Sequence, residues 1–228
     1  FPSLDTLIQH ICKETAIGLN IDRVSIWENT EEKITLENIY VQHEDKHYAD
    51  LTLNKNDFKN YFQAIAKDPL VIASDVYQNN DLTDLGHEYF PKYNIKSLID
   101  IPIYISGKLK AILCLEATNE IKYWSTEDIN FAKTIGDIIA LTIETTKRKN
   151  AENQIIYKNE ILTAIANVTS NLLIHKDKSK IFDSSIEQMG KVLKVDRLYY
   201  FENDIKTNLI SQRFEWVSET DLAEIDNP

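Results

Sequence analysis

Apolar residues recur at spacings of three and four near the start of the chain and again near its end. The first such segment covers residues 2–19 and the second covers residues 177–195. This periodicity places the apolar side chains on one face of a helix, so each segment predicts an amphipathic helix. Ser3 is suited to cap the first helix, because its hydroxyl can accept a hydrogen bond from a free backbone N–H.

Each predicted helix leads into a similar stretch of sequence. Residues 19–29 read LNIDRVSIWEN and residues 193–203 read LKVDRLYYFEN, with five identical positions. Both stretches contain a run of β-branched and aromatic residues that predicts a strand, and a second strand follows each at residues 34–41 and 209–217. The period of this repeat is too long for a solenoid and indicates two domains of one type in tandem.

The middle of the chain adds further elements to the first repeat. A helix is expected around residues 55–67 and a buried strand at residues 68–76, while residues 77–96 are polar, aromatic and irregular. Residues 97–118 predict two strands joined by a Ser-Gly turn. Within them Pro102 lacks a backbone donor and is expected at an edge or a bulge. Adjacent strands flanked by helices indicate an α+β domain with an antiparallel sheet.

A long helix is predicted to close the first repeat and to continue into a linker. Ser125 and Asp128 mark its start, because they have the spacing of a capping box. Residues 145–175 contain no Gly and no Pro, and their apolar residues are roughly heptad-spaced. One interpretation is a solvated helix that packs on its own domain. The other is a signalling helix that pairs with a second copy in a parallel dimer.

Several of these segments together resemble the GAF domain, the small-molecule sensing module of bacterial signalling proteins and of cyclic-nucleotide phosphodiesterases. Besides the opening helix, they are DRVSIWE at 22–28, LVIASDV at 70–76, SLIDIPIYISGKLKAILCLEAT at 97–118 and WSTEDINFAKTIGDIIALTI at 124–143. The resemblance covers residues 3–146. It implies a six-stranded antiparallel, GAF/PAS-like sheet with helices on one face and a ligand cavity under a helix and a loop on the other.

The repeat and the resemblance together predict three parts of the chain. Residues 1–146 are expected to form a GAF domain, residues 147–174 a helical signalling linker, and residues 175–228 the N-terminal part of a second, truncated GAF-like domain. One helix and two strands are too few elements to enclose a core. Three residues of the second domain's first strand are therefore expected to lean on the linker helix or on a partner chain: Leu198, Tyr200 and Phe201.

The charge balance narrows the classes of partner. The chain has 228 residues and a formal net charge of −11, so it lacks the basic surface of a generic nucleic-acid or anionic-membrane binder. No apolar run approaches the ~18 residues that span a bilayer, and a cytoplasmic location is expected. Cys12 and Cys114 each lie in an apolar pattern and are expected to be reduced core thiols.

Residues 43–47, HEDKH, match the zinc-protease pattern H-E-x-x-H. In that chemistry two His on one helix face bind zinc, while the Glu activates a water molecule. Here the segment follows a predicted strand, and the charged residues Asp45 and Lys46 fill its middle. A solvated loop is the favoured interpretation, and a zinc-dependent hydrolase is a remote alternative.

Residues 119–128, NEIKYWSTED, partly resemble the Asn-Lys-Phe-Asp-Glu signature of cyclic-nucleotide-binding GAF domains. Asn119, Trp124 and Asp128 stand at matching positions, but Glu120 stands where the signature has Lys. The Lys–Asp ion pair of that family therefore cannot form as usual, and cyclic-nucleotide binding is not expected. Instead, Trp124 is expected to fix the loop to the core and Asp128 to cap the helix. Covalent bilin attachment is not expected either, since neither cysteine precedes a His.

No catalytic residues are expected in this chain. His87-Glu88 resembles the phosphoacceptor pair of histidine kinases, but it lies in the irregular segment without the pattern of a dimerisation helix. The chain has five Gly and no Gly-rich nucleotide loop. No protein cofactor is expected, although an unknown small-molecule ligand is compatible with the fold.

The expected ligand site is a cavity against the sheet, beneath the loop of residues 76–96. The segments that border it contribute five candidate ligand-binding residues: Asp75, Tyr77, Tyr93, Ser97 and Asp100. An apolar cavity with a few polar groups is the usual form of a small-molecule site. The alternative is that large side chains fill the cavity and that the domain is a ligand-free dimerisation module.

These observations predict a non-catalytic sensory module of a cytoplasmic bacterial signal-transduction protein. A ligand that favours one packing of the 76–96 loop would change the pose of helix 124–146 and, through the linker, act on an output domain of the same parent chain. By family resemblance, that output is a histidine kinase or a diguanylate cyclase. A homodimer through residues 129–172 is expected, with no nucleic-acid partner and no direct membrane insertion.

Overall fold

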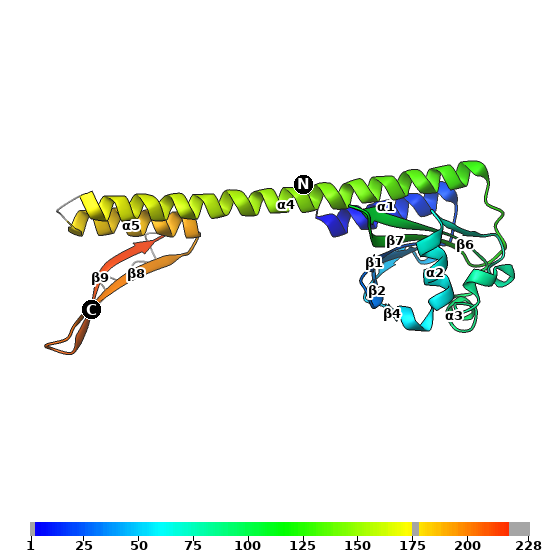
Figure 1. Cartoon of the computed structure of the whole chain (residues 1–228), viewed down its shortest axis with the longest axis horizontal. Helices are drawn as coiled ribbons and strands as arrows, with labels where there is room; N and C mark the ends of the chain where they lie inside the picture. The colour runs from blue at the N-terminus through cyan, green and yellow to red at the C-terminus, as the bar shows by residue number, and fades with distance from the viewer. Residues whose placement is uncertain (1–2, 175–177, 219–228) are drawn as a thin grey trace. The chain divides into compact units, whose positions relative to one another are not determined.

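The computed structural model describes residues 3–174 and 178–218. The chain divides into two compact units, residues 1–147 and residues 148–228, whose elements are shown in Figure 1. The long helix α4, Thr126–Ile174, has its first part in one unit and its second part in the other. Among the described residues, no helix combines the length and the apolar character needed to cross a membrane.

The first unit follows the predicted order of helices and strands, with short elements added between them. Its helices are α1 (Leu4–Leu19), α2 (Lys59–Lys67), α3 (Tyr89–Tyr93) and the first part of α4. Its strands are β1 (Arg23–Asn29), β2 (Lys33–Val41), β3 (Lys46–Tyr48), β4 (Thr52–Asn54), β5 (Val71–Ala73), β6 (Ser97–Ile105) and β7 (Lys108–Ala117). Four 3-10 turns complete it: η1 (Gln42–Glu44), η2 (Lys55–Asp57), η3 (Val76–Gln78) and η4 (Asn80–Leu82).

The strands of the first unit form one antiparallel sheet of order β3-β2-β1-β7-β6-β5, and the short strand β4 pairs with β2 beside this row. The β6–β7 hairpin turns at Ser106 and Gly107, whose φ angles of 52° and 74° are left-handed, as a tight hairpin requires. The predicted α+β class with an antiparallel sheet is confirmed. Strands β3 and β4 are not apparent in the sequence, because three residues are too few to show an alternating pattern.

The sheet separates two apolar cores (Figure 1). Helices α1 and α4 cover one face, where the buried residues include Ile8, Cys12, Ala16, Ile99, Leu113 and Ala132. Helices α2 and α3 with their loops cover the other face, where the buried residues include Trp27, Ile65, Leu82, Phe90, Leu98 and Cys114. Both cysteines are buried and free, one in each core, so the prediction of two core thiols is confirmed.

Strand β5 is shorter than the strand predicted for residues 68–76. It pairs only with residues 98–100 of β6, because the chain turns at Asp75, whose carboxylate caps η3 by accepting the Tyr77 backbone N–H at 3.0 Å. Pro102 lies beyond this pairing, where β7 is the only strand beside β6 among the described residues, so its predicted edge position is confirmed. The segment predicted to be irregular also contains α3, which is too short to show helical periodicity.

The second unit repeats the first three elements of the first unit. Helix α5 (Lys178–Leu193) and helix α1 each contain 16 residues. Strands β8 (Arg197–Asp204) and β9 (Leu209–Val217) form an antiparallel pair after α5, as β1 and β2 do after α1. Residues 175–177 and 219–228 of the expected second domain lie outside the described residues.

The two hairpins also share their register. Arg197 pairs with Val217 as Arg23 pairs with Val41, and in each hairpin a bulge follows the fourth residue of the first strand. A bulge adds one residue to one strand and increases its local twist, so it is a specific feature of a backbone rather than a chance irregularity. The repeat in the sequence is therefore a repeat of local structure.

The first strand of the second unit is more exposed than its counterpart. Val24 and Ile26 are buried in the first unit, whereas Leu198, Tyr200 and Phe201 keep part of their surface exposed. The reason is that β1 lies between two strands of a full sheet, while β8 pairs only with β9 in the described part of the chain. Contacts of these residues with the linker helix or with a partner chain stay a prediction.

Helix α5 nevertheless covers one side of its own hairpin. The Tyr200 ring stacks on Phe182 of α5 with ring centroids 5.0 Å apart, so the expectation that Tyr200 lacks a partner within its own repeat is wrong. A Cβ atom at Gly190 would lie 2.1 Å from Trp216 Cε3. Glycine is therefore needed at position 190 for the helix and the Trp216 indole to approach this closely.

Candidate functional site

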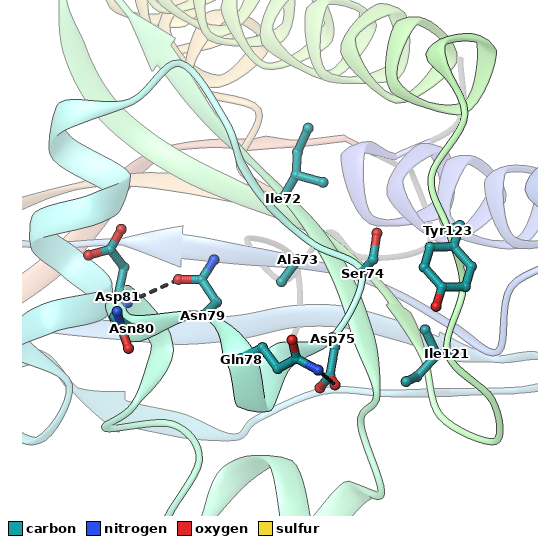
Figure 2. Close-up of a pocket in the computed structure, with 10 residues that line it drawn as sticks. All are labelled: Ile72, Ala73, Ser74, Asp75, Gln78, Asn79, Asn80, Asp81, Ile121 and Tyr123. Carbon is teal, nitrogen blue, oxygen red and sulfur yellow. Dashed lines mark hydrogen bonds between the residues drawn. The ribbon is translucent and has the colours of Figure 1, made fainter.

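Asp75 lines an open pocket near the end of β5 (Figure 2). The pocket encloses about 610 Å³, and its lining comes from the 72–81 segment on one side and from Ile121 and Tyr123 on the other. The Asp75 carboxylate is already engaged, because it accepts the Tyr77 N–H at 3.0 Å and the Gln78 side-chain amide at 2.8 Å. The Tyr77 ring does not line this pocket and packs edge-on against Phe90. Both residues thus shape the η3 turn.

Asp100 is buried on the face of the sheet that α2 covers. The Tyr61 hydroxyl donates to its Oδ2 at 2.8 Å, and its Oδ1 makes no hydrogen bond in the described part of the chain. Asp100 borders an internal cavity of about 20 Å³ that also meets Cys114 and Glu116, space for roughly one water molecule. Burial raises the pKa of Asp100 to about 7; the Tyr61 hydrogen bond opposes this rise and the Glu116 charge adds to it. Asp100 is therefore a buried proton-binding group.

Tyr93 lines a different pocket, which we call the α3 pocket because Tyr89 and Tyr93 of α3 form one of its walls. It encloses about 480 Å³ over β1 and β2, within the range of ordinary ligand sites. The apolar part of the lining outside α3 consists of Trp27, Leu36, Ile39, Val41, Ala49 and Leu51. Polar residues occupy the remaining border: Arg23, His43, Glu44, Tyr48, Lys92, Asn94 and Thr118.

Arg23 gives the α3 pocket a charged end. Its guanidinium carbon lies 4.4 Å from the centre of the Tyr93 ring, and its Nε lies 3.1 Å from Glu116 Oε2. The two charged side chains are only 11% and 4% exposed. The Nε and Oε2 atoms are not aligned as a hydrogen bond, so the pair is held by charge. Burial raises the pKa of Glu116, and the Arg23 charge offsets part of this rise.

The α3 pocket borders the segment that leads into α4. Thr118 lines the pocket, and its backbone N–H donates to Asp22 Oδ2 at 2.7 Å. The side-chain amide of Asn119 donates to the other oxygen of Asp22 at 3.0 Å. Asp22 directly precedes Arg23, the first residue of β1. The start of the segment that leads into α4 is therefore hydrogen-bonded to the same end of β1 that carries Arg23.

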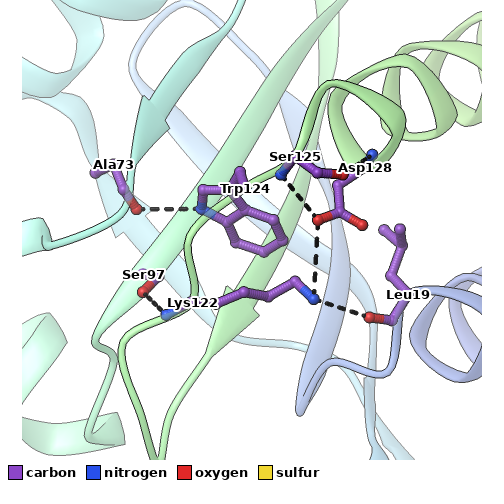
Figure 3. A network of polar contacts seen from close by, with 7 residues as sticks. All are labelled: Leu19, Ala73, Ser97, Lys122, Trp124, Ser125 and Asp128. Carbon is purple, nitrogen blue, oxygen red and sulfur yellow. Dashed lines mark hydrogen bonds and ion pairs between the residues drawn. The ribbon is translucent and has the colours of Figure 1, made fainter.

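A polar network holds the rest of this segment to the sheet (Figure 3). The Trp124 indole N–H donates to the Ala73 carbonyl at 3.3 Å, and the Lys122 backbone N–H donates to Ser97 Oγ at 2.7 Å. Ser97 Oγ in turn donates to the Ser74 carbonyl at 2.6 Å. Ser97 is fully buried and its hydroxyl is used within the fold, so it positions the segment before α4. The expectation that Trp124 fixes the loop to the core is confirmed.

Helix α4 begins with the predicted capping box. Ser125 Oγ accepts the Asp128 N–H at 3.1 Å, and Asp128 Oδ2 accepts the Ser125 N–H at 3.1 Å. Lys122 Nζ lies 3.9 Å from the same Oδ2 and donates to the Leu19 carbonyl at 3.1 Å (Figure 3). The expectation that the Lys–Asp ion pair is lost is therefore wrong in part. The bend at residues 119–120 leaves Glu120 exposed and brings Lys122 to the helix start instead.

The HEDKH segment does not form the helix that the zinc-protease motif requires. His43 and Glu44 lie in the three-residue turn η1, Asp45 has a left-handed φ of 48°, and His47 lies in β3. The His47 Nδ1 is 3.0 Å from Asn38 Oδ1. Within residues 3–174 and 178–218, no group of three or more His, Cys, Asp or Glu is placed to hold a metal ion.

The structure does not bring the five candidate residues together. Asp75 lines the open pocket and Tyr93 the α3 pocket, while Ser97 and Asp100 are buried in separate hydrogen-bonded positions. Their role in ligand binding stays a prediction.

The buried Arg23–Glu116 pair at the α3 pocket was not predicted from the sequence. Glu116 directly follows the apolar run of residues 111–115 in β7, and a buried charge requires a partner. The antiparallel register supplies one by placing Arg23 opposite Glu116.

Comparisons with known proteins agree with this fold. The family model of the GAF domain matches residues 3–143. The GAF domain of a two-component sensor histidine kinase from Bacillus halodurans is similar with a TM-score of 0.50 and 22% identity, over 65% of this chain and 98% of that one. The phycoerythrobilin-bound GAF domain of a cyanobacterial phytochrome is similar with a TM-score of 0.57 and 17% identity, over 65% of this chain and 89% of that one.

One curated relative is the methanogenesis regulatory histidine kinase FilI of Methanothrix harundinacea (strain 6Ac), which is 29% identical over 93 residues. The match covers 40% of this chain and 10% of that kinase, so the chain spans about a tenth of its relative's length. The solved structures, at their low identities, show a shared fold. The family model matches more than half of the 228 residues, and the chain therefore belongs to the GAF domain family.

Proposed function

We propose that this chain is a non-catalytic sensory module and that the α3 pocket is its ligand site. The observation that carries the proposal is the 480 Å³ pocket with one apolar wall and one charged end, since this combination gives both affinity and orientation to a small molecule. Similarity to two histidine kinases supports a role in signal transduction. The parent protein is then a cytoplasmic, bacterial-type signalling protein with a histidine kinase or diguanylate cyclase output.

The proposed signal runs from the pocket to α4. A ligand in the α3 pocket contacts Arg23 and Thr118, and Thr118 begins the segment that carries Lys122 and Trp124 to the helix start. A ligand shifts an equilibrium only as far as it binds one packing better than the other. The ligand is therefore expected to favour one packing of residues 118–125, and with it one pose of α4.

A retained ligand should be visible by native mass spectrometry of the gently purified protein. The wild type is expected to carry extra mass, and an Ala49→Trp variant is expected to lose it, because exposed Ala49 lines the α3 pocket and an indole there would fill the entrance. Ala66→Trp is the matched control, since Ala66 is an exposed residue of α2 that does not line this pocket.

Two results would contradict the ligand proposal. If Ala49→Trp and the wild type carry the same extra mass, the molecule binds elsewhere. If the wild type carries none, and a panel of small metabolites neither binds nor raises its melting temperature, the ligand-free dimerisation module is the better description.

We also propose that the chain forms a parallel homodimer through the second part of α4. Ile155 and Leu162 are 60% and 63% exposed within one chain, and they lie seven residues apart, so they share one side of the helix. Ile165 is also exposed and falls on the adjoining position of the same heptad. A second copy in register would cover this stripe.

The dimer is tested by placing charges in the proposed seam. An Ile155→Glu, Leu162→Glu double variant should be monomeric by light scattering, because dimerisation would bury four unpaired carboxylates. The control is Asn150→Glu, Asn153→Glu, which adds the same charge to the other side of the helix and should remain dimeric. A dimer that survives the first variant would place the interface elsewhere.

The second unit is proposed to be the beginning of a second GAF domain. The shared helix length, strand register and bulge position support this assignment. The boundaries at residues 146 and 174 follow from it and are part of the proposal.

A further inference from the structure

The chemistry of the α3 pocket restricts the class of ligand, if the pocket is the ligand site proposed above. Two basic side chains, Arg23 and Lys92, and one acidic side chain, Glu44, line it together with His43. The Glu44 carboxylate is engaged by the Tyr48 hydroxyl. In a chain whose net charge is −11, two basic groups therefore line one pocket, and Glu116 beside Arg23 offsets part of their charge.

Both basic groups are gathered around one aromatic ring. The Arg23 guanidinium carbon and the Lys92 Nζ lie 4.4 Å and 5.1 Å from the centre of the Tyr93 ring. The ring orients the guanidinium by contact with its face and supplies no hydrogen-bond acceptor to its edge. The two positive charges are therefore concentrated near Tyr93.

The Arg23 side chain donates no hydrogen bond within the described residues, so its donors are available. A guanidinium carries five N–H groups, and the carboxylate of Glu116 is the acidic group that the structure places beside it. The 3.1 Å approach between Arg23 Nε and Glu116 Oε2 is not aligned as a hydrogen bond. A planar acceptor with two oxygens would match the edge of the guanidinium better than any other simple group.

Glu116 also limits the charge of that acceptor. It is 4% exposed and lies behind Arg23, where it neutralises much of the guanidinium charge. A dianion such as a phosphate monoester would be repelled by Glu116 more strongly than a monoanion would. The apolar wall of Trp27, Leu36 and their neighbours in turn requires a body without charge.

We propose that the α3 pocket binds a small monocarboxylic acid with an apolar or aromatic body, the carboxylate on Arg23 and the body against Trp27, Leu36 and Ile39. Lys92 adds a second positive charge near the carboxylate. Glu116 sets the strength of the interaction, because it competes with the ligand for the same guanidinium. This inference rests on the proposed function and adds the ligand class to it.

Three probes with one body and different head groups test the ligand class: phenylbutyrate, phenylbutyramide and phenylbutylamine. Isothermal titration of the full chain should show the acid binding at least about tenfold more tightly than the amide, the amount expected for a hydrogen bond to a charged group. The amine should bind more weakly than the amide.

Two variants assign that preference to Arg23. Glu116→Gln removes the competing carboxylate and should increase the preference for the acid further. The double variant Arg23→Gln, Glu116→Gln removes both charges together, so no buried charge is left unpaired, and the preference for the acid should then fall to the small part that exposed Lys92 supplies. Circular dichroism and a cooperative unfolding transition confirm that the double variant is folded.

Equal binding of acid and amide by the wild type would overturn the acid class and leave the α3 pocket as a ligand site. A preference for the acid that is undiminished in the double variant would overturn the assignment to Arg23. If none of the probes binds and native mass spectrometry finds no retained molecule, both the ligand class and the proposed function fail.

Discussion

Replacing Asp100 with Asn should greatly reduce the loss of stability that the first unit shows as the pH rises from about 4 to 7. In the wild type, burial raises the pKa of Asp100 from 3.8 to about 7. Between these values the folded state holds a proton that the unfolded state has released. The contribution of Asp100 to stability is therefore complete below about pH 4 and is lost as the pH rises through 7.

The expected effect is large. The difference between the two pKa values corresponds to about 4 kcal/mol of unfolding free energy. The Asn side chain has no proton to lose, so this loss does not occur in the variant. Its amide keeps the Tyr61 hydrogen bond but leaves a buried NH₂ group, at a cost of about 1–3 kcal/mol that is the same at every pH. Near pH 8 the variant should therefore be more stable than the wild type by roughly 1–3 kcal/mol.

Denaturant unfolding at a series of pH values measures this difference. A Trp216→Phe background is useful, because Trp27 and Trp124 of the first unit then supply the fluorescence signal. Tyr61→Phe is the control: the Tyr61 hydroxyl lowers the pKa of Asp100, so its loss should move the decline in stability to higher pH. If Asp100→Asn and the wild type show the same pH dependence, the carboxyl is not a buried proton-binding group.

Replacing Arg23 with Gln should destabilise the first unit by about 3–5 kcal/mol, because it leaves the Glu116 carboxylate buried without a partner. Glu116 is 4% exposed and Arg23 is 11% exposed, so water cannot readily replace the lost charge. Adding Glu116→Gln to this variant removes the unpaired charge and should restore most of the loss. A buried ion pair replaced as a unit often changes stability little.

The three variants form a double-mutant cycle that isolates the interaction of the pair. We expect Arg23→Gln to be the most damaging, Glu116→Gln to be milder because Arg23 lies at the edge of the α3 pocket, and the double variant to be less stable than the wild type by at most about 2 kcal/mol. Additive losses would show that the two side chains do not interact, and the charged end of the α3 pocket would need another description.

Local sequence patterns were sufficient to predict most elements of the fold. The alternation of β-branched residues predicted β1, β2, β6 and β7, and the Ser-Gly pair predicted their left-handed turn. The capping box at Ser125 and Asp128 marked the start of α4. These features depend on residues that are close in sequence, so the sequence alone displays them. Strands β3 and β4 and helix α3 are too short to produce a pattern.

The pockets could not be predicted in the same way. Asp75 and Ser97 are polar residues in the expected segments, but their side chains are used in hydrogen bonds with Tyr77 and with the Ser74 carbonyl. Whether a polar side chain is available to a ligand depends on which neighbours satisfy it, and those neighbours are fixed by packing. Of the five candidates, Tyr93 lines the α3 pocket, and the ligand-binding role of all five stays a prediction.

The sequence by itself determined that this chain repeats a helix and a hairpin, that its first repeat is a GAF domain, and that a long helix follows. The tertiary structure decided which charged residues meet. Arg23 and Glu116 are 93 residues apart in sequence, and the pairing of β1 with β7 brings them together. Asp128 pairs with Lys122, two residues beyond the position at which the family signature has its Lys, because the chain bends at residues 119–120. Propensity and periodicity act over a few residues, whereas the partner of a buried charge is set by strand register and by the path of a loop.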